Sequence, residues 1–102
     1  MSMLHIVNKS PFEKNSLDSC LRLSKTGSSV LLIEDGVYGA LKGTDIASDL
    51  ESSLEQKKIY VLGPDLKARG INPDSLIAGI ESVDYDGFVS LAAAASKTQS
   101  WM

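Results

Sequence analysis

The chain has 102 residues, of which 43% are hydrophobic and 23% charged, and its formal net charge is -3. This length is typical of one domain, and this balance excludes disordered, collagen-like and low-complexity proteins. The acidic charge without basic runs argues against direct nucleic-acid binding. No segment approaches the ~20 apolar residues that span a membrane, and the start lacks a signal-peptide pattern, so a cytoplasmic protein without membrane contact is expected.

Apolar runs and turn residues predict strands and helices in alternation. In chain order, the pattern predicts a strand over 4–7, a helix from 15 or 16 to about 25, a strand over 30–33, a helical turn over 37–41, a helix over 46–55, a strand over 58–62, a helix over 65–69, a helical turn within 73–80, a strand over 82–85 and a helix over 86–97. Thr44 or Asp45 is expected to cap the helix over 46–55, in which Ile46, Leu50 and Leu54 share one face. Such alternation is typical of βαβ units. The sequence therefore predicts a small Rossmann-like α/β fold, with a mostly parallel sheet, helices on both faces, and residues 1–102 in a single domain.

Ligands of parallel α/β sheets usually bind beyond the carboxyl ends of the strands. That rule directs attention to the loops at 8–10, 35–36 and 63–65. Glu34 and Asp35 could act as an acid/base pair or hold a cation, but adjacent residues on a strand point to opposite faces, so turn formation is the expected role. The glycines form neither a dinucleotide-binding fingerprint nor a phosphate-binding loop, and no nucleotide or other cofactor is expected.

The chain has one histidine, His5, and one cysteine, Cys20. It therefore cannot close an internal disulfide, and it is poorly supplied for a zinc site, so no metal is expected. His5 lies within an apolar strand, where a packed or hydrogen-bonded histidine is more common than a ligand.

Cys20 is the candidate catalytic residue. On a helical wheel it lies near the middle of an apolar arc about 160° wide, which Leu17, Leu21, Leu23 and Ser24 complete. A lone cysteine on such an arc is more often a small buried hydrophobe than a reactive thiol, and no neighbouring residue clearly lowers its pKa. The arc is wider than a helix commonly lays on its own core, so part of it is available to another chain.

Short blocks of sequence, in order along the whole chain, resemble the DsrH/TusB family. They are 3–12 (MLHIVNKSPF), 31–37 (LLIEDGV), 59–62 (IYVL), 65–70 (DLKARG), 84–91 (DYDGFVSL) and 100–102 (SWM). The resemblance implies the DsrE/DsrF/DsrH-like α/β fold and the smallest subunit of a heterohexamer, with two copies each of this chain, a DsrE-like and a DsrF-like subunit. It also implies a part in persulfide transfer to a DsrC/TusE-like sulfur acceptor.

The resemblance leaves two branches and two roles open. Cys20 is typical of the DsrH branch, which serves sulfur oxidation, whereas the TusB branch serves 2-thiolation of the tRNA wobble uridine and can have an aliphatic residue there. In both branches the principal sulfur-carrying cysteine belongs to the DsrE/TusD subunit. The sequence-based interpretation is a sulfur-relay subunit of the sulfur-oxidation branch with Cys20 as its sulfur site. The alternatives are a TusB-type subunit, a structural subunit that positions a partner's cysteine, and a small-molecule-binding domain with a pocket at the strand ends.

Overall fold

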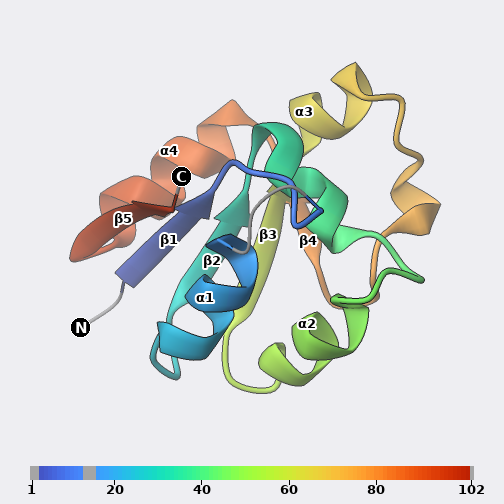
Figure 1. The fold of residues 1–102 in the computed structure, drawn as a ribbon. Coiled ribbons are helices and arrows are strands. Elements are labelled where there is room, and N and C mark those ends of the chain that lie inside the picture. Colours follow the sequence, from blue (N-terminus) through green and yellow to red (C-terminus); the bar gives the residue numbers. More distant parts are fainter. Residues whose placement is uncertain (1–2, 13–15, 102) are drawn as a thin grey trace.

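The computed structural model describes residues 3–12 and 16–101 (Figure 1). Its strands are β1 (Met3–Val7), β2 (Ser29–Leu32), β3 (Lys58–Leu62), β4 (Glu81–Val83) and β5 (Lys97–Trp101). Its α-helices are α1 (Ser16–Leu23), α2 (Ala47–Ser53), α3 (Gly63–Ala68) and α4 (Tyr85–Ala94), and two 3-10 helices are η1 (Glu34–Ala40) and η2 (Pro73–Ser75). None of the helices in these two described ranges is long and apolar enough to cross a membrane.

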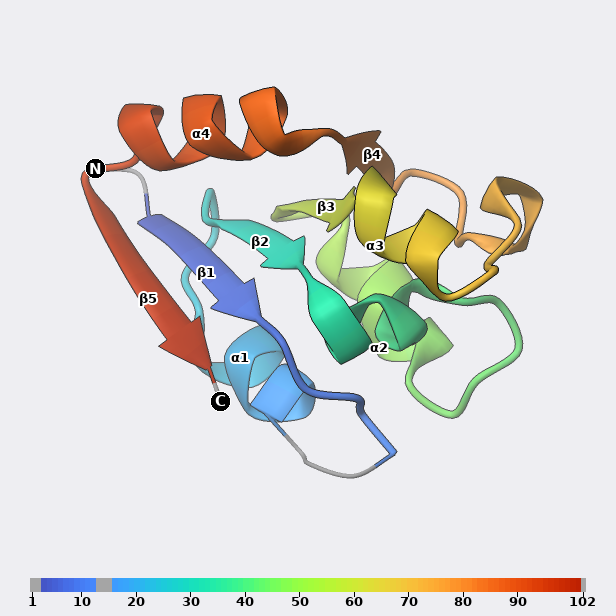
Figure 2. The same ribbon diagram turned by 90° about the horizontal axis from the view of Figure 1, so that it is seen from above.

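The five strands form one sheet in the order β4-β3-β2-β1-β5, and every neighbouring pair is parallel. Helices α1 and α2 lie on one face, while α4 crosses the other (Figure 2). The predicted α/β class, with a parallel sheet and helices on both faces, is confirmed.

The main core lies between the sheet and the α1/α2 layer. Leu17 and Leu50 from the two helices meet strand residues that are almost inaccessible to solvent, among them Val30 and Val61. Because side chains alternate along a strand, Leu31 faces the opposite side, where it is also fully buried. A strand buried on both faces needs a continuous apolar run, which explains why the sequence at 30–32 predicts a central strand.

The strand β5 is absent from the sequence-based prediction. The predicted last helix extended to residue 97, whereas α4 ends at Ala94 and the chain then turns into β5 beside β1. Crossing from β4 to β5 covers four strand spacings, about 19 Å. The ten residues of α4 supply about 15 Å of that path.

The start of α2 also differs from the prediction. Thr44 or Asp45 was expected to cap the helix, but α2 begins after Ile46 and no side chain caps it. The predicted packing of this helix is confirmed, because Leu50 is buried while Ile46 and Leu54 pack against the core. Asn15, the alternative start of the first helix, lies outside the described residues.

Candidate functional site

Cys20 lies inside the main core. Its side chain is fully buried on α1, together with Leu17 and Leu21. Leu23 is 68% exposed and Ser24 is half-buried, so the apolar arc extends beyond the core, as its width indicated. The burial of Cys20 agrees with the interpretation of this residue as a small hydrophobe.

Burial also governs the chemistry of the Cys20 thiol. Loss of solvent raises the pKa of Cys20 to about 12, although the nearby Lys57 ammonium acts in the opposite direction. Lys57 is itself buried, and its Nζ donates a hydrogen bond of 2.6 Å to the carbonyl oxygen of Leu21. A thiol with this pKa is protonated near neutral pH, whereas the attacking species in sulfur transfer is the thiolate.

The predicted loops at the carboxyl ends of the strands do come together. Gly36 lies against the backbone of Val7 and Asn8, so closely that a Cβ at position 36 would overlap the Val7 carbonyl oxygen. Asp65, at the start of α3, accepts a hydrogen bond of 2.6 Å from the backbone N–H of Glu34.

The carboxylates of Asp35 and Asp65 in these loops are occupied by structural contacts. The Arg69 guanidinium binds Asp35 through Nε and Nη2, each 3.0 Å from Oδ1. Glu34 has a positive φ of 49°, a conformation that costs energy for a residue with a side chain, and its N–H contact with Asp65 helps to hold it. The expected turn-forming role of Glu34 and Asp35 agrees with this arrangement, in which η1 begins directly at Glu34.

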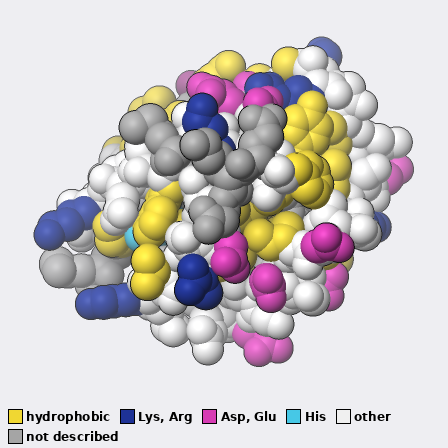
Figure 3. Space-filling model, in the orientation of Figure 1, with side chains coloured by type: hydrophobic (Ala, Val, Ile, Leu, Met, Phe, Trp, Pro, Cys, Tyr) yellow, Lys and Arg dark blue, Asp and Glu magenta, His cyan; other side chains and the backbone are white. Residues whose placement is uncertain are grey.

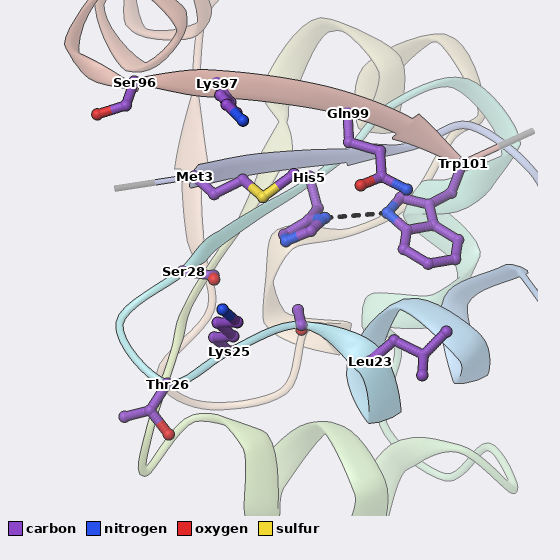
Figure 4. A pocket seen from close by; sticks show the side chains of 11 residues that line it. Met3, His5, Leu23, Lys25, Thr26, Ser28, Ser96, Lys97, Gln99 and Trp101 are labelled. Atoms are coloured by element: carbon purple, nitrogen blue, oxygen red, sulfur yellow. Dashed lines mark hydrogen bonds between the residues drawn. The ribbon is translucent and has the colours of Figure 1, made fainter. Parts of the chain in front are cut away.

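A cavity lies elsewhere, beside β1 and β5 (Figure 4). It has a volume of about 540 Å³, and its walls come from β1, the end of α1, the loop before β2 and β5. The lining residues are Met3, His5, Leu23, Ser24, Lys25, Thr26, Ser28, Ser96, Lys97, Gln99 and Trp101. The loops at the carboxyl ends of β1, β2 and β3, where a ligand was expected from the sequence, therefore do not line this cavity.

His5 and Trp101 are joined across one wall of the cavity. The indole Nε1–H of Trp101 donates a hydrogen bond of 3.0 Å to Nδ1 of His5, and the ring centroids are 6.0 Å apart. Because Nδ1 is the acceptor, the neutral imidazole carries its proton on Nε2. His5 is 3% exposed, and its Nε2 has no hydrogen-bond partner among the described residues. The expectation of a packed, hydrogen-bonded histidine is confirmed for one ring nitrogen only.

This environment predicts a pH dependence of stability. Burial, assisted by the Lys57 charge, lowers the pKa of His5 from 6.5. His5 therefore binds a proton more readily in the unfolded chain than in the folded one. The free energy of unfolding should accordingly decrease as the pH falls below about 6.5. Urea unfolding at pH 7.5 and pH 5.5 should show the loss in the natural chain and a smaller loss in His5→Gln. Equal losses in both chains would mean that His5 does not contribute.

Among residues 3–12 and 16–101, no three His, Cys, Asp or Glu side chains are grouped so that they could hold a metal ion. The amino-acid sequence alone does not predict the cavity. Its one available signal was that His5 and Trp101 lie in blocks that resemble the same family at opposite ends of the chain, but only the β1–β5 pairing makes these blocks adjacent.

The fold is similar to that of solved structures of low sequence identity. The YchN protein from E. coli superimposes with a TM-score of 0.82 at 24% identity, over 98% of this chain and 99% of that chain. A protein described as of unknown function, MTH1491 from Methanobacterium thermoautotrophicum, gives a TM-score of 0.73 at 17% identity, over 94% of this chain and 95% of that one. These likenesses show the fold.

Sequence comparison shows the family. The family described as "DsrH like protein" matches residues 9–98. Protein TusB from Pectobacterium parmentieri is 35% identical over 99 residues, and TusB from Erwinia tasmaniensis is 38% identical over 104. Each of these matches covers 97% of this chain and 100% of the relative. From the family match and these full-length relatives, the chain belongs to the DsrH/TusB family.

Proposed function

We propose that this protein is a cytoplasmic, TusB-type subunit of a sulfur relay that serves 2-thiolation of the tRNA wobble uridine. The observation that carries the branch is the similarity to TusB proteins along their whole length. We give this full-length similarity more weight than the presence of a cysteine at position 20, which is the single feature that favours the sulfur-oxidation branch. The coarser role, a part in a multi-subunit sulfur relay, follows from the family resemblance.

Within that relay, we propose that the chain is a structural subunit that positions a cysteine of a partner subunit. The buried and protonated state of Cys20 supports this role over that of a sulfur carrier. In the transfer step, a thiolate of the DsrE/TusD-like partner attacks the outer sulfur of a donor persulfide. The donor's S–S bond breaks, the donor leaves as a thiolate, and the partner retains the persulfide for a TusE-like acceptor.

Intact-mass analysis of the assembled complex tests the proposed role. After incubation with glutathione persulfide, the partner subunit should gain about 32 Da, one sulfur atom, in a form that reductant removes. This chain should gain no mass, and Cys20→Ala should leave sulfur transfer to the acceptor within about twofold, because a buried thiol takes no part in the step. A reducible gain on this chain that Cys20→Ala abolishes would instead assign the relay site to Cys20.

Deletion of the encoding gene tests the branch. Nucleoside analysis of total tRNA by mass spectrometry should show loss of 2-thiouridine derivatives, with recovery when either the natural chain or Cys20→Ala is supplied in trans. Unchanged thiolation together with impaired oxidation of stored sulfur would return the protein to the sulfur-oxidation branch.

A further inference from the structure

The cavity beside β1 and β5 has buried hydrogen-bonding atoms that the described residues leave unpaired. Four buried side-chain atoms in the described part of the chain lack a partner, and two of them, His5 Nε2 and Ser24 Oγ, belong to residues that line this cavity. A buried polar atom without a hydrogen-bond partner destabilises the folded chain. An acceptor bound in the cavity would remove the cost for the Nε2–H donor.

The cavity is also positively charged, although the chain as a whole is acidic. Lys25 and Lys97 line it, and none of its described lining residues carries a carboxylate. In Figure 4, Lys97 lies above His5 and Lys25 lies below it, so the two lysines are on opposite sides of the imidazole. In Figure 3, dark-blue side chains lie on the left, where β1 and β5 begin, while magenta side chains gather over α2. A donor that lacks a partner, within a cationic rim, favours an anion.

The remaining walls favour an organic ligand over a bare inorganic ion. Met3, Leu23 and Trp101 supply apolar and aromatic surface, and about 540 Å³ falls in the range of small-molecule sites. Sites of this kind combine apolar walls with a few polar groups that fix orientation.

We propose that this cavity binds a small organic carboxylate, with its anionic group directed at His5 Nε2 and the lysine rim and its apolar body against Trp101 and Leu23. The carboxylate accepts the hydrogen bond from Nε2–H, while Ser24 and Lys25, which line the same cavity just after α1, provide a hydroxyl and a positive charge. This site is separate from Cys20, which is sealed in the core, and its existence does not depend on the proposed relay function.

Nuclear magnetic resonance of the full-length chain tests the proposal with benzoate as the probe. The single tryptophan and the single histidine give one indole N–H signal and one imidazole signal. A shift of either signal can therefore be assigned to Trp101 or His5 in the cavity. Benzoate should shift both signals to saturation and raise the pKa of His5, because a bound carboxylate favours the imidazolium. Benzyl alcohol, which keeps the ring but lacks the charge, should bind about tenfold more weakly or worse.

Two double variants, each of which removes two positive charges, distinguish the effect of the lysines at the cavity from the effect of the chain's net charge. Lys25→Gln with Lys97→Gln should weaken benzoate binding about fivefold at constant ionic strength, since each exposed charge contributes about 0.5 kcal/mol. Lys42→Gln with Lys67→Gln, which removes exposed lysines away from the cavity, should leave it unchanged. Equal weakening by both pairs, equal binding of benzyl alcohol, or no saturable shift at about 50 mM benzoate would overturn the proposal.

Discussion

Alkylation of Cys20 by iodoacetamide is expected to be at least a thousandfold slower than alkylation of an exposed thiol on the same helix. With a pKa of about 12, only about one Cys20 side chain in ten thousand is a thiolate at pH 8. An exposed cysteine with a pKa near 8.5 is about one-quarter thiolate at that pH. Full burial slows the reaction further, because the reagent must wait for local opening.

The matched control moves the thiol by two positions to the solvent-facing side of α1. In Cys20→Ala combined with Arg22→Cys, the single cysteine replaces an exposed residue. The natural chain in about 6 M guanidinium, where burial is lost, gives the second reference. If folded Cys20 reacts within about tenfold of the Arg22→Cys thiol, the thiol is accessible and its assignment as a sulfur carrier regains support.

Gly36→Ala is expected to destabilise the chain by at least about 3 kcal/mol, a large part of the stability of a typical small domain. The added Cβ would overlap the Val7 carbonyl oxygen and lie 3.0 Å from the Val7 carbonyl carbon. Both atoms belong to the backbone of β1, which is paired on both sides, so neither can move aside cheaply. Urea unfolding followed by circular dichroism measures the loss.

Gly27→Ala serves as the comparison for this variant. Gly27 has a φ of 90°, and an added Cβ there meets no described atom within 4 Å. Its cost is the backbone strain alone, about 1–2 kcal/mol. If Gly36→Ala is no more harmful than Gly27→Ala, the close approach between η1 and β1 is not important for stability.

The elements that the sequence predicts well are those in which local pattern and final burial agree. The run at 30–33 predicts a strand covered on both faces, and β2 is that strand. The arc around Cys20 predicts a buried thiol, and the core of α1 contains it. In both cases the apolar residues that form the local pattern are the residues that the folded chain buries, so the pattern predicts the structure.

The features that the sequence did not predict depend on contacts between distant segments. The strand β5 reads Lys-Thr-Gln-Ser-Trp, and four of its five residues are exposed, so no apolar alternation marks it. The cavity needs this strand beside β1 and the loop before β2, and neither neighbour is evident from local sequence. Lys57 gives no local sign that its ammonium will be buried against the end of α1.

The pairing of β1 with β5 has a consequence for how the chain folds. Each residue pair in this register is 94 positions apart, whereas the β1–β2 pairs are 25 apart. Closing the longer loop costs more chain entropy, and pairings between such distant segments form slowly. β1 can join β2 and β3 early through short crossovers, and β5 then adds last, at the edge. We therefore expect that the outer edge of β1 stays unpaired until β5 joins, and an unpaired edge is a site at which folding chains readily associate with one another.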